Sequence, residues 1–302
     1  MKKRFLLGIL VLFCLLLPIV FANTVELGTY VINVDSYNFV DGTYALDFWL
    51  TLKCDYDCSF DEFYIVNSID TRSELAYHDG QVKSYLTHAK LSAPVDLREY
   101  PFDKQQMFMI IEHKQLPASE LKIVPLLEFT AVDERVQIPG WRIGDWHTKV
   151  YDHWYSGWDD YWQAYYFSVE LARPAIDGII ESFLPILFLA LIILFTYLLG
   201  TDRLELRLGI VGSVFVALVV LHLAMTSQLP SVGHMTLLDK FVMLTYFVAL
   251  CSFFINTYLL HLRHIKKNVW LKKLNDWTRY GLPIIFILCY VALFYFFFKS
   301  LV

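Results

Sequence analysis

Hydrophobic and polar residues alternate along residues 29–172, and turn sequences such as HDGQ, LPAS and IPG interrupt the alternation at short intervals. Successive side chains of a β-strand point to opposite faces, so alternation indicates strands with one buried face. Two runs show it most clearly, because each places four apolar residues on one face: Leu46, Phe48, Leu50 and Leu52, and Tyr165, Phe167, Val169 and Leu171. The pattern predicts an all-β domain arranged as an immunoglobulin-like sandwich.

The alternation ends near residue 174, and four long apolar segments follow. They cover residues 176–199, 206–229, 237–260 and 280–298. Each is close to the ~20 residues that an α-helix needs to span a bilayer. The chain is 57% hydrophobic and 18% charged, whereas soluble domains contain about a quarter charged residues. We expect a sandwich domain over residues 23–174 and a four-helix transmembrane domain over residues 175–302.

The first 22 residues have the composition of a secretory signal peptide. Basic residues at positions 2–4 precede an apolar run over residues 5–17, and Val20 and Ala22 form the small-residue exit. A short first membrane span is the alternative, but the run is brief and the cleavage site is good. Cleavage would place the sandwich domain outside the cytoplasm, where disulfides form.

The connections between the apolar segments differ in charge. The sequence HLRHIKKNVWLKKLNDWTR, between the third and fourth segments, contains six Lys or Arg, whereas PSVGHMT, between the second and third, contains none. Basic connections lie in the cytoplasm. The pattern therefore predicts a multi-pass protein of the cell (inner) membrane with an extracellular or periplasmic N-terminal domain, in agreement with the signal peptide.

One face of the second segment is distinctive. Helical spacing places small or hydroxylated residues at both ends of a stripe and apolar residues at its centre: Gly209, Ser213, Val216, Val220, Leu223 and Ser227. Small residues allow transmembrane helices to pack closely, and the stripe taken alone favours that interpretation. The alternative is a pore lining with a hydrophobic gate, which requires several copies of the helix around an axis.

Two cysteines lie close together in KCDYDCS, at Cys54 and Cys58. In a straight strand their Cα atoms would be about 13 Å apart, so a disulfide requires the residues between them to form a turn. We expect this disulfide rather than a cation site built from Asp55 and Asp57.

Several motifs appear in the order typical of one membrane-protein family. LREYPFDKQQ at 97–106 has a Pro-Phe-Asp core, LARP at 171–174 precedes the first span, and FLP at 183–185 opens it. QLPSVGHMTLLDKF at 228–241 joins the second and third spans. Together these motifs resemble the bacterial pentameric ligand-gated ion channels of the Cys-loop receptor family. The resemblance covers residues 29–260, and the fourth span matches in hydrophobicity only.

The resemblance implies a homopentamer in the lipid bilayer, with the second helices around a central pore and ligands bound between neighbouring sandwiches. It places Glu205 at the mouth of the pore, ahead of the stripe. It also implies a coupling zone between the sandwich and the helices, formed by Tyr37 to Thr43 and by Pro101, Phe102, Asp103, Arg173, Pro230 and His234. A pair between Asp103 and Arg173 is compatible with a gating role or with a purely structural one.

The agonist site is expected near the aromatic segment YDHWYSGWDDYWQAYYF at 151–167, which matches the capping hairpin of the family. Aromatic faces beside carboxylates suit an organic cation such as an amine. The candidate ligand-binding residues are Trp49, from a neighbouring subunit, and Trp154, Tyr155, Trp158 and Tyr161. An aromatic cluster without a ligand is the alternative. Protons are a second candidate agonist, because the charge of an imidazole changes near neutral pH and His222 and His234 lie in the second span and the coupling loop. Neutral, hydrogen-bonding histidines are the alternative.

Ion selectivity depends on Glu205 and Arg207. Glu205 resembles the acidic ring of cation channels, whereas Arg207 followed by Gly209 resembles a feature of anion-selective glycine receptors. The Pro-Ala pair of those anion channels is replaced here by Glu205 and Leu206. We therefore expect monovalent cations to be the permeant ions.

Other functions receive little support. The chain contains no glycine-rich phosphate loop, nucleophile elbow or paired metal-ligand motif, so we expect no enzyme activity, no cofactor and no metal. The net charge of −5 does not suggest a nucleic-acid partner. The main alternative is a non-conducting membrane sensor that signals through a partner protein on the basic cytoplasmic connection.

Overall fold

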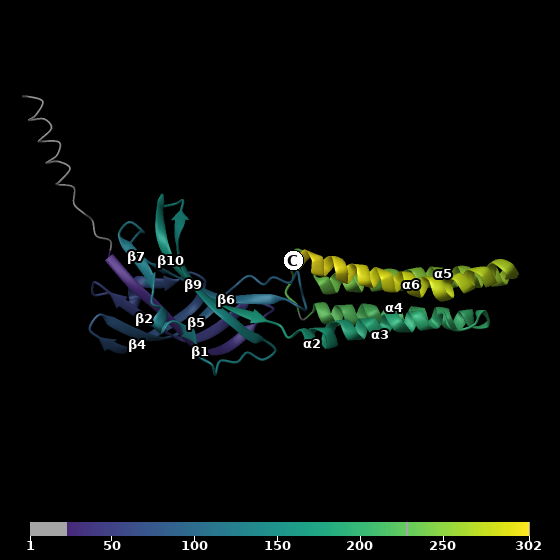
Figure 1. The fold of residues 1–302 in the computed structure, drawn as a ribbon, viewed down its shortest axis with the longest axis horizontal. Helices are drawn as coiled ribbons and strands as arrows, with labels where there is room; N and C mark the ends of the chain where they lie inside the picture. Colours follow the sequence, from purple (N-terminus) through teal and green to yellow (C-terminus); the bar gives the residue numbers. More distant parts are fainter. Residues whose placement is uncertain (1–22, 228, 302) are drawn as a thin grey trace, which may run out of the picture.

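The computed structural model describes residues 23–227 and 229–301. The signal peptide expected at residues 1–22 lies outside the described residues. β-Strands gather at one end of an elongated molecule, and four long helices run side by side at the other end (Figure 1). The alternating and continuous apolar patterns of the sequence therefore correspond to separate regions in space.

Two sheets form the N-terminal region. The first contains β4 (Ser68–Asp79), β5 (Val82–Ser92), β2 (Thr43–Cys54), β1 (Asn23–Asn38) and β7 (Leu121–Pro125) in this order, and β8 (Ala131–Val132) also pairs with β1. The second contains β3 (Phe63–Ile65), β6 (Lys104–His113), β10 (Asp160–Ala172) and β9 (Arg142–Tyr155). β7 and β8 are parallel to β1, and the remaining pairs are antiparallel. The predicted β-sandwich is confirmed.

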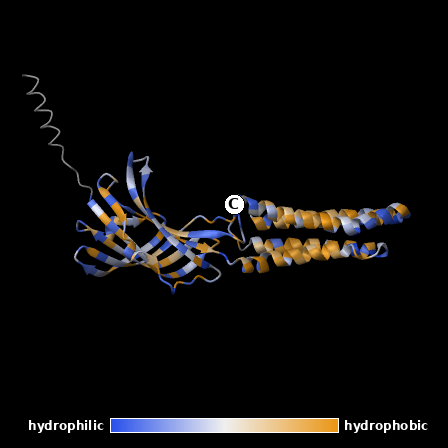
Figure 2. Ribbon diagram, in the orientation of Figure 1, coloured by the Kyte–Doolittle hydropathy of each residue, from blue (hydrophilic) through white to orange (hydrophobic). Residues whose placement is uncertain are grey.

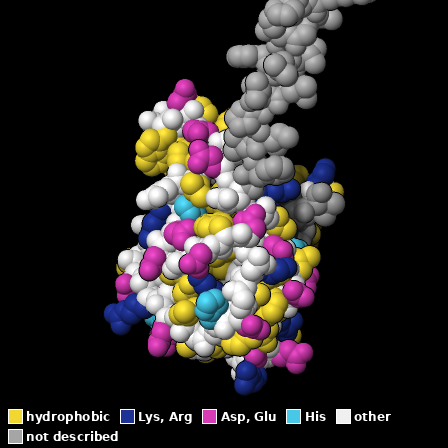
Figure 3. Space-filling model, turned by 90° about the vertical axis from the view of Figure 1, so that its left-hand side faces the viewer, with side chains coloured by type: hydrophobic (Ala, Val, Ile, Leu, Met, Phe, Trp, Pro, Cys, Tyr) yellow, Lys and Arg dark blue, Asp and Glu magenta, His cyan; other side chains and the backbone are white. Residues whose placement is uncertain are grey.

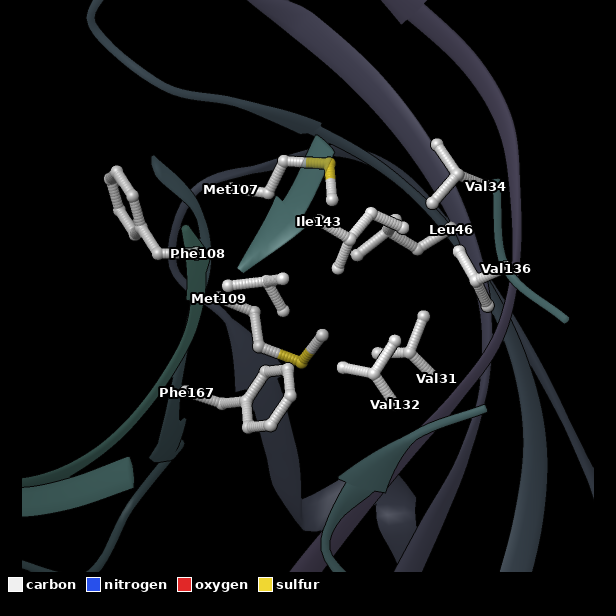
Figure 4. A pocket seen from close by; sticks show the side chains of 11 residues that line it. Val31, Val34, Leu46, Met107, Phe108, Met109, Val132, Val136, Ile143 and Phe167 are labelled. Atoms are coloured by element: carbon white, nitrogen blue, oxygen red, sulfur yellow. The ribbon is translucent and has the colours of Figure 1, made fainter. Parts of the chain in front are cut away.

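The core lies between the two sheets. The apolar faces of β2 and β10 are buried, as their alternation predicted, and Phe48, Leu50 and Leu52 are 0% exposed. A gap of about 10 Å³ lies in this core. Figure 4 shows apolar side chains that line it, such as Val31, Met109 and Phe167. The gap is far smaller than a ligand pocket, so it belongs to the packing of the sandwich.

Four helices follow the sandwich. The first span comprises α2 (Ala175–Gly178), a π-helical turn (Ile179–Phe183) and α3 (Leu184–Thr196). A short 3₁₀ turn (Thr201–Arg203) leads into α4 (Leu204–Thr226), and α5 (Leu237–His264) and α6 (Asn268–Leu301) complete the bundle. All four spans are long and apolar enough to cross a membrane. Figure 2 shows that their apolar surface gives way to polar residues at the end away from the sandwich.

The element ends differ from those expected from hydropathy. β1 begins at Asn23, six positions before the alternation becomes clear at Thr29. More markedly, most of the basic connection at 261–279 is helical, because α5 continues to His264 and α6 begins at Asn268. Lys266 has a left-handed backbone with φ of 55° where the chain reverses between the two helices. Hydropathy marks where a helix leaves the apolar layer, whereas backbone conformation and capping decide where the helix ends.

Candidate functional site

The stripe on α4 is uncovered along its whole length. Val216, Val220 and Leu223 are 63%, 62% and 65% exposed, and Glu205, Gly209, Ser213 and Ser227 are also exposed. The opposite face of the same helix packs against the rest of the bundle and buries Leu204, Arg207, Val211, Val214 and Leu218. Within one chain, the candidate pore residues therefore form the free face of α4.

The two charged candidates at the start of α4 point to different environments. The Glu205 side chain is 63% exposed, and both of its carboxylate oxygens lie 3.3 Å from Nη1 of Arg263. Arg207 is 0% exposed and donates a hydrogen bond to the carbonyl oxygen of Leu199. Residues two positions apart on an α-helix are separated by about 200° around the helix axis, so Glu205 and Arg207 cannot share a face. Of the two, Glu205 is the one on the side of the stripe.

A buried ion pair lies where the sandwich meets the helices. Nε of Arg173 donates to Oδ1 of Asp103 at 2.9 Å, and the Asp103 side chain is only 1% exposed. Gln105 donates to the other carboxylate oxygen at 2.7 Å. The Arg173 guanidinium also lies 4.5 Å from the ring centre of Trp141. The carboxylate therefore has two donors, and the cation is held by both a charge and an aromatic face.

The loop that contains this aspartate touches the helices directly. Phe102 stacks on Phe183 with ring centres 5.7 Å apart, and the carbonyl oxygen of Tyr100 accepts a hydrogen bond from the Leu238 amide at 3.3 Å. A Cβ atom added at Gly178 would lie 2.7 Å from the carbonyl oxygen of Pro101. This close approach places the loop against the first turns of both the first and the third span.

The loop between α4 and α5 completes the junction. Nε2 of His234 lies 3.8 Å from Oδ1 of Asp96, just before the LREYPFDKQQ motif at 97–106, and Pro230 is half-buried in the α4–α5 connection. On the sandwich side, burial and the negative charge of Asp103 raise the pKa of Tyr37 to about 12. Tyr37 also contacts Trp141 edge to face, with ring centres 5.5 Å apart. The expected coupling residues thus meet at one interface.

All of the aromatic candidates except Trp49 lie on the β9–β10 hairpin, which stands out from the end of the sandwich in Figure 3 with hydrophobic and acidic side chains near its tip. They divide into two groups. Trp154 and Tyr161 pack together with ring centres 4.8 Å apart, whereas Tyr155 packs against Trp158 at 5.2 Å and Trp162 at 5.6 Å. Trp49 lies on β2 in the other sheet.

The second aromatic group adjoins a buried carboxylate that sequence reasoning missed. Glu112 on β6 is 0% exposed and accepts hydrogen bonds from the hydroxyls of Tyr64 at 2.8 Å and Tyr155 at 2.7 Å. Nδ1 of His153 lies 3.3 Å from its other oxygen. We call Tyr64, Glu112, His153 and Tyr155 the Glu112 cluster.

The electrostatics of this cluster keep its phenols protonated. Burial, the hydrogen bond between the two tyrosines and the Glu112 carboxylate raise the pKa of Tyr64, and burial raises the pKa of Tyr155. The cluster combines a buried carboxylate, hydroxyl donors and a histidine under aromatic rings. This chemistry suits a proton or an organic cation as the species bound. Its only signal in the sequence is Glu112 on a strand rich in methionine and isoleucine.

Cys54 and Cys58 form a disulfide with Cα atoms 6.2 Å apart, and the residues between them reverse the chain. Both carboxylates of this turn have protein partners. Asp55 accepts hydrogen bonds from the Thr24 amide at 2.9 and 3.0 Å, and Asp57 pairs with Lys83 at 2.6 Å. The carboxylates of Asp55 and Asp57 therefore bind protein groups and do not converge on a common site for a cation.

A comparison with known proteins finds an ion channel that is similar to this chain in sequence. No protein-family model matches the chain. A proton-gated ion channel from Gloeobacter violaceus (strain ATCC 29082 / PCC 7421) is 24% identical over 225 residues. These residues are 73% of this chain and 61% of the relative, so the match spans less than two thirds of that protein. The chain is therefore similar in sequence to an ion channel, and its sandwich followed by four apolar helices is consistent with the fold of the pentameric channels.

Proposed function

We propose that the chain forms a cation channel of five copies that a ligand or protons open. The exposed stripe of α4 carries this proposal. Its polar ends and apolar centre stay uncovered while the opposite face of the helix is buried. A ring of such helices would enclose a pore, and the similarity to a proton-gated ion channel supports that use of the face.

In this arrangement the stripe has three functional parts. Five copies of Glu205 form an acidic ring that concentrates cations at the mouth away from the sandwich. Gly209 and Ser213 leave room for hydrated ions at the narrow end. Val216 and Val220, with Leu223, form the hydrophobic segment that closes the pore by excluding water.

Gating starts in the extracellular sandwich domain, at the Glu112 cluster. Protonation of His153 or Glu112, or arrival of an organic cation under Trp158, changes the charge balance around a carboxylate that is fully buried. The β9–β10 hairpin carries half of this cluster, and the other end of β10 leads to Arg173 and the junction. Movement of the hairpin is thus passed along one strand to the first span.

The test is to reconstitute the full-length protein in lipid bilayers and record currents while the pH is lowered and small amines are added. The thiol accessibility of Ser213→Cys is then compared with that of Ile284→Cys, an exposed position on α6. Cys251 and Cys289 are replaced by serine in both variants, because they are free thiols. We expect a water-soluble thiol reagent to block the current of the α4 variant only.

Two results would contradict the proposal. The first is equal block of both cysteine variants, which would remove α4 from the pore. The second is the absence of current under all conditions together with a particle mass that does not correspond to five chains. The second result would favour the non-conducting membrane sensor.

A further inference from the structure

Four polar side chains fall between the same two apolar clusters of the helix bundle. Arg207 on α4 is placed between Leu204 and Val211, and Asn256 on α5 between Ala249 and Leu259. The two members from α6 are Asn275 and Arg279, between Leu271 and Leu282. These apolar residues belong to two separate buried clusters, one nearer the sandwich and one at the far end. We call Arg207, Asn256, Asn275 and Arg279 the polar layer.

The polar layer is buried and incompletely hydrogen bonded. Arg207 and Asn256 are 0% exposed and Asn275 is 8% exposed. Nε and Nη1 of Arg207, Nε of Arg279 and the side-chain oxygens of both asparagines are buried without a hydrogen-bond partner. An unpartnered buried polar group is costly, and most such groups in native proteins bind another group.

The charge of the layer has little compensation within the chain, where the Arg207 guanidinium lies 6.0 Å from the ring centre of Tyr197. Arg279 acts on Arg207 as a like charge, and Arg207 lies in the first turn of α4, where the helix dipole is positive. The ion pairs near the start of α4 join Arg203 to Asp202 and Arg263 to Glu205, and neither pair includes a member of the polar layer.

Among the described residues, Asp202 is the acidic side chain whose charge acts on Arg207, but it is exposed and pairs with Arg203. Asp276, the acidic residue of α6, is exposed. Water would complete hydrogen bonds but leave two positive charges inside a membrane segment.

We infer that the polar layer is a binding site for a phosphate group that also carries hydroxyl donors. Guanidinium forks match phosphate oxygens, which would occupy the free N–H groups of Arg207 and Arg279. Hydroxyls of the same ligand would donate to the free oxygens of Asn256 and Asn275. Arg279 is half-buried on α6, so the ligand would enter beside it. Inorganic phosphate and the phosphoglycerol headgroup of a membrane lipid both have this chemistry.

Binding is tested on the purified full-length protein in detergent, by thermal unfolding and native mass spectrometry. The probes are inorganic phosphate, dioctanoyl phosphatidylglycerol, dioctanoyl phosphatidylcholine and chloride at equal ionic strength. We expect phosphate or phosphatidylglycerol to raise the unfolding temperature, while phosphatidylcholine and chloride do not. A response to phosphate alone identifies the free ion, and a response to phosphatidylglycerol alone identifies the lipid.

The matched variants are Arg279→Gln and Lys272→Gln, which remove one positive charge each from α6. Loss of a charge-assisted hydrogen bond should weaken binding to Arg279→Gln by about tenfold. Lys272 is exposed, so Lys272→Gln should bind like the unmodified protein. Equal weakening in both variants would show that only the general charge of α6 matters and would overturn the inference.

A further variant distinguishes loss of binding from loss of folding. Asn275→Leu removes a buried oxygen without a partner, so we expect the ligand-free protein to unfold at a higher temperature. The ligand-induced shift should become smaller in the same variant. An unmodified protein whose unfolding temperature does not respond to phosphate or phosphatidylglycerol also overturns the inference. None of these measurements uses ion currents, so the result is independent of the proposed channel function.

Discussion

At the scale of single residues, Asp103 shows how a buried charge makes the junction depend on one partner. The carboxylate is almost fully enclosed, and Arg173 supplies the compensating positive charge at 2.9 Å. Removing one member of a buried ion pair leaves the other charge desolvated and alone, which costs more than the pair itself contributes. The position of Arg173 at the end of β10 means that this cost falls on the link between sandwich and helices.

Replacing this arginine should therefore be strongly destabilising. We expect Arg173→Gln to lower the free energy of unfolding by about 3–5 kcal/mol, because Asp103 remains buried without a cation. Thermal unfolding of the purified protein measures the effect. Arg142→Gln, at an exposed position on β9, is the control and should change stability little. Similar losses in the two variants would contradict the assigned importance of the pair.

Tyr37 gives a pH-dependent prediction at the same interface. Its pKa is raised to about 12 by burial and by Asp103, so the folded protein holds the phenolic proton more tightly than the unfolded chain does. The resulting stability is complete below pH 10 and is lost as the pH rises from 10 to 12. Tyr37→Phe should show a shallower decline of unfolding temperature over that range. Identical pH profiles for both proteins would contradict this assignment.

At the scale of elements, the sequence patterns predicted each class of structure but not its limits. Alternation identified the buried faces of β2 and β10, because a strand between core and solvent must alternate. The start of α6 at Asn268 was not predicted, since charged residues can continue a helix beyond the apolar layer.

The Glu112 cluster was not predicted for a different reason. Glu112 lies on the outward face of β6, and Tyr64 and Tyr155, on β3 and β9, cover it. Periodicity indicates which residues face the core of the sandwich. It carries no information about which neighbouring strand closes over the opposite face.

The contact between Pro101 and Gly178 yields a prediction about how elements fit together. A methyl group at Gly178 would meet the carbonyl oxygen of Pro101 at 2.7 Å, so Gly178→Ala must displace the loop or the first span. We expect a loss of about 1–3 kcal/mol of stability, typical of overpacking. Gly157→Ala is the control, because its added Cβ would have no atom within 4 Å. Unfolding temperatures of the two variants test the difference.

At the scale of the whole molecule, the sandwich and the bundle form one elongated body joined by a narrow interface (Figure 1). The Glu112 cluster lies in the sandwich and Glu205 lies at the far end of the bundle, so any communication between them passes through the junction. The free face of α4 acquires a function only when further copies surround it, since one helix cannot enclose water.

Selectivity is the property that tests this assembled state. In the proposed pentamer, Glu205→Gln should lower the ratio of sodium to chloride permeability by about tenfold, since a charged ring concentrates counter-ions by about that factor or more. Reversal potentials in asymmetric sodium chloride measure this ratio. Asp202→Asn removes an exposed carboxylate just before α4 and should leave the ratio nearly unchanged. A reversal potential of the unmodified channel that follows chloride would refute cation selectivity.

The burial of Arg207 behind Glu205 also determines the direction of an electric field. Two opposite charges two positions apart, one outside the bundle and one inside it, form a dipole perpendicular to the helix axis. Five such dipoles around an axis would all have their negative ends toward the centre. A ligand that neutralises Arg207 would remove the positive end and leave the field at the mouth more negative. The occupant of the polar layer would then adjust conductance without entering the pore.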